Sequence, residues 1–429
     1  MSFPLLIRTY RTATTLLEPA VLGLLYWRQR KGREDRTRLG ERRGHPSRAR
    51  PNGHLIWVHG ASIGETLSLL PVVERLTQRG LFVLVTSGTR TSAALIARRL
   101  PPGALHQYVP LDVPRYVRRF LDHWQPDIAL VAESEIWPNT IVALDQRHIP
   151  LVLVNARMSD RSFRRWQKLP RIIGALLERH ALCLAQTEDD AERLAILGAP
   201  RVVVTGNLKF DSPPPPADPR VVAHLSGLLA GRPVWFAAST HPGEESAILA
   251  VHRALAQRHP HLLTIIAPRH PHRGAEIAGI AESHGLRASK RSDGIPPDRA
   301  VDVYVADTVG EMGLFYRVSP IVIMGGSLIA HGGQNPIEPA KLGAAILHGP
   351  HIHNFEEIYA SIGAARGALM VKDSASLARA VSELLNNTAL TRDMARAASD
   401  AVQALGGAVD RTMQSIEPYI VHTKLGARR

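Results

Sequence analysis

The stretch from Val58 to Leu70, VHGASIGETLSLL, contains a carboxylate that could serve either the fold or a reaction. Ser62 and Glu65 have the spacing of a capping box, in which the serine accepts from the N3 amide and the glutamate accepts from the N-cap amide. Glu65 also follows a candidate first β-strand, and open α/β sheets bind ligands beyond the carboxyl ends of their strands. Both roles are open for Glu65 from this stretch alone.

Two more carboxylates follow a later apolar run. Glu133 and Glu135, in VAESEIWPN, come directly after DIALVA. Side chains two apart share a face if a strand continues, whereas Pro138 favours a turn into a helix. An unpaired buried charge is expensive. The two carboxylates are therefore either groups that act on a ligand or structural groups that form ion pairs and cap the next helix.

A single lysine follows the last apolar run of the first half of the chain. Lys209 lies in GNLKFD, just before a proline-rich stretch that we interpret as a domain boundary. A cation at that place suits an anionic ligand facing the boundary. The alternative is a solvated surface lysine.

The second half of the chain contains three segments that could bind an anionic nucleotide. Arg269 and His270 follow a strand pattern in IIAPRHPHR, and an arginine fork suits a phosphate or a carboxylate. Gly310 and Glu311 lie at a predicted loop-to-helix junction in DTVGEMGLFY. The third segment is GGSLIAHGGQNPIEPA, residues 325–340.

This third segment is rich in glycine and then opens a helix. We expect Asn335 at the N-cap and Pro336 at N1, and free amides at a helix N-terminus bind phosphate. Glu338, at N3, could complete the cap or bind a ribose hydroxyl. The chain contains neither GxGxxG nor GxxxxGK[ST], which argues against classical dinucleotide and P-loop sites. It also lacks Asp-x-Asp and Cys/His metal spacings, so we expect no metal site and no cofactor.

These residues need strands to position them, and short apolar runs alternate with helical patterns throughout the chain. Such runs are typical of strands buried on both faces in a doubly wound parallel sheet. The candidate strands of the first half are residues 55–58, 81–85, 127–132, 150–154, 182–185 and 202–204. Those of the second half are residues 234–239, 262–268, 301–307, 321–326, 344–349 and 368–371.

A proline-rich connector, SPPPPADP, separates the two halves. Four consecutive prolines cannot continue a helix or a central strand, so the sequence predicts two α/β domains of similar size joined by a stiff linker. The predicted segments are a basic N-terminal segment (1–50), a first domain (51–211), the linker (212–219), a second domain (220–405) and a helical tail (406–429).

The net charge of +14 is concentrated at the N-terminus, where residues 1–50 hold 12 Lys and Arg against 4 Asp and Glu. The apolar run from Leu16 to Trp27 is shorter than the ~20 residues of a spanning helix, and Glu18 and Pro19 interrupt it. Tyr26 and Trp27 adjoin a basic flank, as at a membrane interface. We expect a helix that lies in an anionic membrane surface; a helix packed on its own domain is the alternative.

The remaining composition is that of an ordinary globular protein. Its 429 residues include one cysteine, Cys183, so the chain forms no internal disulfide and suits a reducing compartment. Cys183 lies in an apolar run, which indicates an inert core residue. Aromatic residues make up only 5% and the excess charge is local, so nucleic-acid binding is not expected.

Taken together, these motifs resemble those of the 3-deoxy-D-manno-octulosonic acid (Kdo) transferases. ASIGE, E-x-E-x-WPN, NARMS, GNLKFD, STHPGEE, APRHP, DTxGE and GGSL…GGQNPIEP occur in this order between residues ~35 and ~420, after GERRG at residues 40–44. The resemblance implies a GT-B fold, with two Rossmann-like domains facing a cleft. It also implies transfer of Kdo from CMP-Kdo to a lipid A precursor, at the cytoplasmic face of the inner membrane.

Carried over by motif, the resemblance assigns a role to each candidate. Glu65 matches the general base of the family, and Glu133 and Lys209 match residues assigned to transition-state stabilisation. The first domain would bind the acceptor and the second would bind CMP. The CMP-binding segments correspond to Pro268, Arg269, Val309, Gly310, Glu311, Asn335, Pro336, Ile337 and Glu338.

This assignment is chemically consistent without a metal. An inverting transfer needs a base on the acceptor hydroxyl and stabilisation of the departing phosphate, which Lys209, Arg269 and the helix at Asn335 could supply. Two other classes remain as alternatives. One is a GT-B enzyme that uses a UDP-sugar, either a transferase or an epimerase. The other is a non-catalytic membrane adaptor that uses the basic N-terminus.

Overall fold

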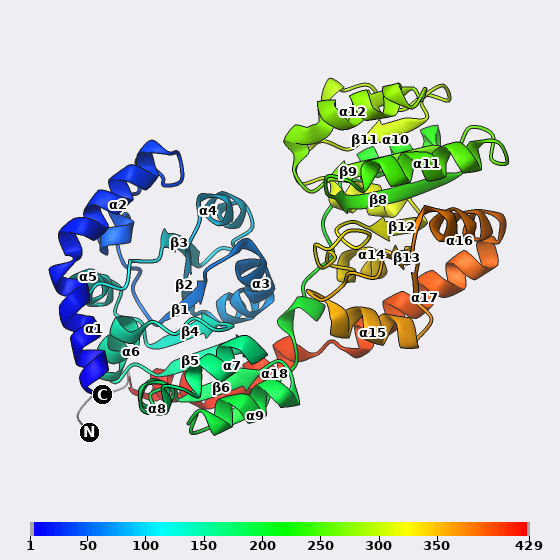
Figure 1. The fold of residues 1–429 in the computed structure, drawn as a ribbon. Coiled ribbons are helices and arrows are strands. Elements are labelled where there is room, and N and C mark those ends of the chain that lie inside the picture. The colour runs from blue at the N-terminus through cyan, green and yellow to red at the C-terminus, as the bar shows by residue number, and fades with distance from the viewer. Residues whose placement is uncertain (1–3, 427–429) are drawn as a thin grey trace. The chain divides into compact units, whose positions relative to one another are not determined.

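The computed structural model describes residues 4–426, and the chain divides into two compact units. Unit 1 comprises residues 1–212 and 406–429, and unit 2 comprises residues 213–405. The segment that the sequence set apart as a tail therefore belongs to unit 1. Figure 1 shows its helix, α18, running beside helices of the first half of the chain.

Unit 1 is built on a seven-stranded parallel sheet with the order β3-β2-β1-β4-β5-β6-β7. Its strands are β1 (Leu55–Gly60), β2 (Phe82–Ser87), β3 (Ala104–Tyr108), β4 (Ile128–Ala132), β5 (Leu151–Ala156), β6 (Leu182–Ala185) and β7 (Val202–Val204). Its helices are α1 (Leu5–Leu16), α2 (Glu18–Arg30), α3 (Ile63–Gln78), α4 (Arg90–Ala97), α5 (Pro114–Trp124), α6 (Pro138–Asp145), α7 (Asp160–Trp166), α8 (Pro170–Leu177), α9 (Glu188–Ile196) and α18 (Ala408–Gly426), with 3-10 turns η1 (Glu41–Arg43) and η2 (Leu208–Phe210).

Unit 2 repeats this plan with the order β10-β11-β9-β8-β12-β13-β14, again parallel throughout. Its strands are β8 (Val234–Thr240), β9 (Leu263–Pro268), β10 (Ala288–Lys290), β11 (Val303–Val305), β12 (Ile321–Met324), β13 (Ala345–His348) and β14 (Ala368–Met370). Its helices are α10 (Pro219–Leu228), α11 (Glu245–Ala256), α12 (Gly274–Ser283), α13 (Met312–Val318), α14 (Ile337–Lys341), α15 (Glu356–Ala364), α16 (Ser374–Asn386) and α17 (Thr388–Ala404), with 3-10 turns η3 (Pro271–Arg273) and η4 (Arg291–Asp293).

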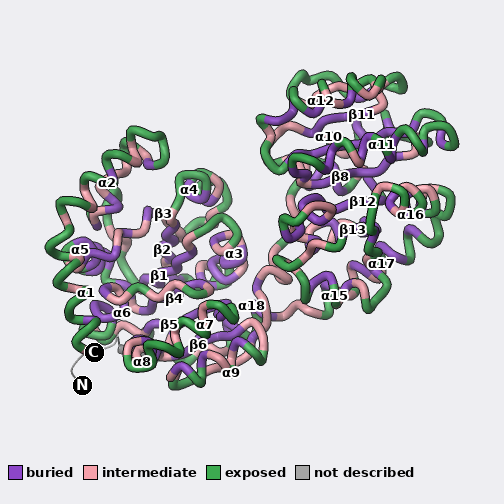
Figure 2. The backbone as a smooth tube through the Cα atoms, in the orientation of Figure 1, coloured by how far each residue is buried: buried purple, intermediate pink, exposed green. Residues whose placement is uncertain are grey.

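Both sheets are buried on both faces, as the continuous apolar runs predict. In unit 1, α3 and α18 cover one face, and Leu69 and Ile416 belong to that core. Residues of α1, α5, α6 and α8 pack on the other face. Figure 2 shows buried strands and helices whose outer surfaces are exposed. The predicted class, two doubly wound parallel α/β domains, is confirmed.

The strand order matters for function because it changes direction beside the first strand of each sheet. In unit 1 this switch point lies between β1 and β4, where His59 pairs with Val131. In unit 2 it lies between β8 and β12. Ligands of open α/β sheets bind at such points, beyond the carboxyl ends of the strands.

The N-terminal segment forms two helices rather than one, because α1 ends at Leu16 and α2 begins at Glu18. One side packs on unit 1, where Ile7 and Leu25 are buried. The other side is exposed. Within residues 4–426, no helix is both long and apolar enough to cross a bilayer.

Candidate active site

Glu65 is held at the carboxyl end of β1 by the start of α3. Ser62 is the N-cap of α3, and its Oγ accepts from the Glu65 amide at 3.3 Å and donates to Glu65 Oε1 at 2.6 Å. Glu65 Oε2 accepts from the amide of Ala61 at 2.8 Å. The predicted capping box is therefore displaced by one residue, because the glutamate reaches the amide before the N-cap.

The backbone around Glu65 leaves little room to move. A Cβ on Gly60 would lie 2.9 Å from the amide nitrogen of Thr66 and 3.2 Å from Glu65 Cβ, so glycine lets the helix start close to the strand end. Thr66 Oγ1 donates to the carbonyl of Gly60 at 3.2 Å. The strand, the turn and the first turn of α3 thus fix the Glu65 carboxylate at the switch point.

Glu133 and Glu135 do not share a strand face, because β4 ends at Ala132. Glu133 adopts φ +56°, which turns the chain away from the sheet. Its Oε1 accepts from Nζ of Lys209 at 2.9 Å, and both side chains are partly buried. Glu135 instead accepts from Nε1 of Trp137, before α6 begins at Pro138.

Lys209 reaches Glu133 because two asparagines hold its loop. Asn155, at the end of β5, accepts from the amide of Leu208 at 3.0 Å. Asn207, the N-cap of η2, accepts from the amide of Lys209 at 3.0 Å. Lys209 is thus a positioned partner of Glu133 rather than a solvated surface lysine.

The carboxylates of Glu65, Glu133 and Glu135 lie close enough to affect one another's charge. Burial raises the pKa of Glu135 above its ordinary value, and the negative charges of Glu65 and Glu133 raise it further. His59 Nε2 lies 3.9 Å from Glu135 Oε2, and burial lowers the pKa of His59 to about 4, so this imidazole is neutral near pH 7. The structure thus brings Glu65, Glu133 and Lys209 to one region of unit 1.

A cavity of about 310 Å³ opens beside this region, wholly within unit 1. Polar side chains, including His59 and Glu135, line part of it. Most of the remaining lining is apolar and includes Leu25 of α2 and Ile141 of α6. Carboxylates next to an apolar space suit a ligand with a hydroxyl group on an apolar body.

The candidate residues of unit 2 follow β9, β11 and β12, so they reach the same edge of its parallel sheet. Pro268 ends β9, and Arg269 is exposed, with its amide bonded to the carbonyl of Thr240 at 2.9 Å. Gly310 adopts φ +91°, as a turn before α13 requires. Val309 is 85% exposed and is available to a ligand.

Glu311 is the N-cap residue of α13 and is already engaged by a cation. Arg291 Nη2 and Nε donate to its two carboxylate oxygens at 2.7 and 3.0 Å. This hydrogen-bonded arginine holds the pKa of Glu311 below its ordinary value. Glu311 therefore stays ionised, and Thr308 also donates to it.

The predicted cap at Asn335 is displaced by one residue. Helix α14 begins at Ile337 with Pro336 at the N-cap, so Pro336 is not at N1. Asn335 Oδ1 nevertheless accepts from the amide of Ile337 at 3.1 Å, the bond that a capping side chain makes. Glu338 lies in the first turn of this five-residue helix. Its charge raises the pKa of Tyr316, after the larger effect of burial.

The residues that hold the glycine-rich loop after β12 are not among the site residues predicted from the sequence. Glu244 is buried and accepts from the amides of Gly326 and Leu328 at 2.7 and 3.1 Å. The rings of His241 and His331 are tilted by 36° with centroids 3.8 Å apart, and Gln334 Nε2 lies 3.0 Å from His241 Nε2. The STHPGEE motif carried this signal, since it contains both His241 and Glu244.

Comparison with known proteins decides the family. The model of the "3-Deoxy-D-manno-octulosonic-acid transferase (kdotransferase)" family matches residues 37–212. A 3-deoxy-D-manno-octulosonic acid transferase of Haemophilus influenzae is 34% identical over 418 residues, covering 96% of this chain and 98% of the relative. The chain belongs to the Kdo transferase family.

Other comparisons agree with this assignment. A probable mitochondrial 3-deoxy-D-manno-octulosonic acid transferase of Arabidopsis thaliana is 36% identical, covering 94% of this chain and 93% of the relative. A glycosyltransferase structure from Rickettsia africae has a TM-score of 0.57 at 12% identity, covering 86% of this chain and 99% of that one. The latter supports the fold alone, which is of the GT-B type. The chain is thus a GT-B enzyme of the Kdo-transferring kind, so the adaptor alternative is excluded.

Proposed function

We propose that this Kdo transferase moves Kdo from CMP-Kdo to a hydroxyl group of a lipid A precursor, with inversion and with Glu65 as the general base. Glu65 takes the hydroxyl proton as the acceptor oxygen bonds to C2 of Kdo. The bond from C2 to the phosphate oxygen breaks, and CMP leaves with the bonding electrons. The observation that carries this proposal is the pair of carboxylates at one switch point, one of them held by a lysine.

The surroundings of Glu65 support its role as a base. Its two oxygens accept from only one backbone amide and one hydroxyl, and no described cation forms an ion pair with it. A carboxylate with spare lone pairs can accept a further proton from a bound hydroxyl group. Glu133 differs because it is paired with Lys209, and this pair suits charge stabilisation better than proton removal.

The donor would bind to unit 2 through its strand-end segments. The exposed Arg269 suits a phosphate. Glu244 fixes the course of the loop after β12 by accepting from the amides of Gly326 and Leu328. The proposal needs no metal to balance the charge of CMP. Among the described residues, no group of three His, Cys, Asp or Glu side chains has the arrangement of a metal site.

The lipid part of the acceptor is supported by two features of unit 1. The cavity beside Glu135 is largely apolar, and exposed apolar side chains gather on α1 and α2. These exposed side chains are Leu5, Leu6, Leu16, Leu24, Tyr26 and Trp27. Together with the basic residues after Trp27, these side chains suit binding to the cytoplasmic surface of an anionic inner membrane.

The test is Kdo transfer by the purified chain, followed by mass spectrometry of the lipid product. With CMP-Kdo and a tetraacylated lipid A precursor, we expect one or more added Kdo units. CMP should compete with the donor and UDP should not. Absence of transfer would contradict the proposal, and inhibition by UDP but not CMP would favour a UDP-sugar enzyme.

A further inference from the structure

Helix α7 carries a concentration of positive charge that the proposed chemistry does not use. Residues 157–171 include six exposed cations: Arg157, Arg161, Arg164, Arg165, Lys168 and Arg171. Among the described residues, no salt bridge involves any of the six. The single acid of the stretch, Asp160, is paired with Arg193 of α9 at 2.6 Å.

Arg164 and Arg165 lie in the last turn of α7, where a cation favours the helix dipole, whereas Arg161 lies in the first turn, where a cation is unfavourable. Like charges four residues apart on a helix repel each other, and Arg161 and Arg165 have that spacing. Phe163 and Trp166 already pack α7 against the hydrophobic core that includes residues of α8 and α9. The helix therefore has its apolar contacts without the arginines, and neither packing nor the helix dipole accounts for Arg161 beside Arg165.

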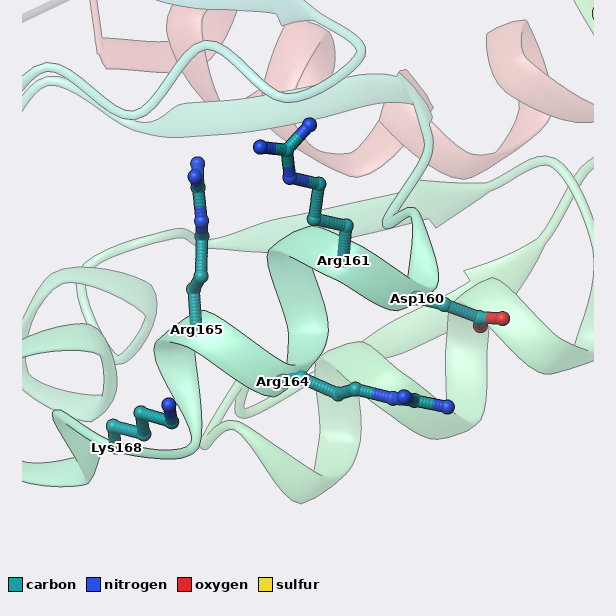
Figure 3. A pocket seen from close by; sticks show the side chains of 5 residues that line it. All are labelled: Asp160, Arg161, Arg164, Arg165 and Lys168. Atoms are coloured by element: carbon teal, nitrogen blue, oxygen red, sulfur yellow. The ribbon is translucent and has the colours of Figure 1, made fainter.

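Figure 3 shows how the side chains lie around an open hollow of about 460 Å³. Arg161 and Arg165 rise from the same side of α7, whereas Arg164 and Asp160 point to another side. Lys168 lies beyond the end of the helix and also lines the hollow. Guanidinium forks on one side of a helix suit the oxygens of a phosphate group, which accept several hydrogen bonds at once.

The hollow belongs to the same strand edge as the proposed base. Arg157 is the first residue after β5, and its amide donates to the carbonyl of Glu133 at 3.4 Å. Helix α7 begins three residues later. A ligand that presents a hydroxyl group to Glu65 therefore lies at the same edge of unit 1 as these arginines.

We propose that Arg161 and Arg165, with Lys168, bind a phosphate group of the acceptor headgroup. The inference rests on the proposed function, in which the acceptor is a phosphorylated lipid bound by unit 1. An anionic membrane surface is less suited to α7, because its apolar residues Phe163 and Trp166 pack inward. Leu169 is the one large apolar side chain of residues 157–171 that is strongly exposed.

The test compares two acceptors that differ only in phosphorylation, with the Arg161→Gln/Arg165→Gln variant. For the phosphorylated acceptor we expect KM to rise by about tenfold, the loss expected for two exposed ionic contacts. KM for the dephosphorylated acceptor and KM for CMP-Kdo should stay within twofold. Arg161→Lys/Arg165→Lys should restore part of the loss, since it keeps the charge but not the fork.

Arg98→Gln/Arg99→Gln is the matched control, because it removes two exposed arginines of unit 1, beyond the end of α4, that form no salt bridge within residues 4–426. A second readout is equilibrium binding of a phosphorylated glucosamine disaccharide without acyl chains, which the variant should weaken and the control should not. The inference is overturned if the unsubstituted enzyme transfers Kdo but the variant changes KM equally for both acceptors. It is also overturned if the variant changes KM for neither acceptor.

Loss of binding to anionic vesicles with acceptor KM unchanged in detergent would overturn it in favour of a membrane contact. Failure of the unsubstituted enzyme to transfer Kdo would instead overturn the proposed function. In that case the disaccharide-binding measurement still decides whether α7 binds phosphate.

Discussion

Glu133 is one of the non-glycine residues whose backbone adopts a positive φ. Its φ of +56° places a non-glycine residue in the left-handed region, at a cost of order 1–3 kcal/mol. This turn ends β4 and directs the carboxylate to Lys209 instead of leaving it beside Glu135. Strain that aims a side chain at a charged partner is common where a ligand is bound.

The Glu133–Lys209 pair gives the first prediction. Lys209→Gln leaves a partly buried carboxylate without its cation and removes a positive charge from the proposed transition state. We expect kcat to fall by roughly 10²-fold or more. Lys372→Gln, which removes an exposed lysine of unit 2, is the control and should leave kcat within twofold. A normal rate for Lys209→Gln would exclude Lys209 from catalysis.

The raised pKa of Glu135 gives a second prediction, about stability. Burial, then Glu65 and Glu133, keep the proton on folded Glu135 at pH values where the unfolded chain has lost it. Folding therefore loses stability as pH rises from the ordinary pKa of a glutamate towards the raised value. Glu135→Gln removes this penalty, so the variant should melt above the parent at pH 7.

The difference in melting temperature should shrink as pH falls to 4, where both forms of the parent hold the proton. Thermal melts of both proteins across this range measure it. Glu178→Gln, at an exposed position, should show no pH-dependent difference. A difference for Glu135→Gln that grows at low pH would contradict the assignment.

Among the elements, α18 depends on a carboxylate from the GNLKFD motif. Asp211 accepts from the amides of Gly407 and Val409 at 2.7 and 2.6 Å, at the N-terminus of the helix. We expect Asp211→Ala to lower the free energy of unfolding by roughly 1–2 kcal/mol, the value of a good cap.

Asp410→Ala is the control for this cap, because Asp410 lies in the first turn of the same helix and forms an exposed ion pair with Arg75. Its effect should stay within about 0.5 kcal/mol. Denaturant unfolding measures both variants. Equal effects would mean that the Asp211 cap contributes little.

The exposed side of α1 and the turn after it give a prediction about the membrane. Leu16 and Leu17 are 74% and 56% exposed, so Leu16→Ser/Leu17→Ser removes apolar surface without opening a cavity. We expect binding to anionic vesicles to weaken by about tenfold, with the melting temperature unchanged.

Ile196→Ser/Ile295→Ser removes two equally exposed isoleucines, at 59% and 62%, from other places. This control should bind vesicles as the parent does. An equal loss of vesicle binding in both variants would mean that α1 and α2 do not form the membrane-binding surface.

The elements also show what the sequence could predict. The apolar strands of both sheets were predicted because burial on both faces demands continuous apolar runs. β3, ALHQY, was missed because it is an edge strand whose polar His106 and Gln107 hide the pattern. His106 bonds to Ser87 and Arg38, contacts that a local pattern does not reveal. β10, ASK, was missed because it is a three-residue edge strand.

At the scale of the whole molecule, the limits of the sequence lie in long-range packing. The tail after residue 405 reads as helical, but only the fold shows that Ile416 and Met413 complete the core of unit 1. Likewise, GNLKFD shows a lysine but not its distance to Glu133. The order of the motifs was sufficient to predict the family, because few families share eight motifs in one order, whereas many share any single motif.

The catalytic assignment of Glu65 is the central claim, and one variant tests it. Glu65→Gln keeps a side-chain oxygen for the amide of Ala61 and an amide group that can bond Ser62, so the melting temperature should stay within about 2 °C. An amide cannot take the hydroxyl proton, so kcat for Kdo transfer to the lipid acceptor should fall by about 10²-fold or more. A variant that melts early but transfers Kdo at the normal rate would contradict the account and leave Glu65 as a helix cap alone.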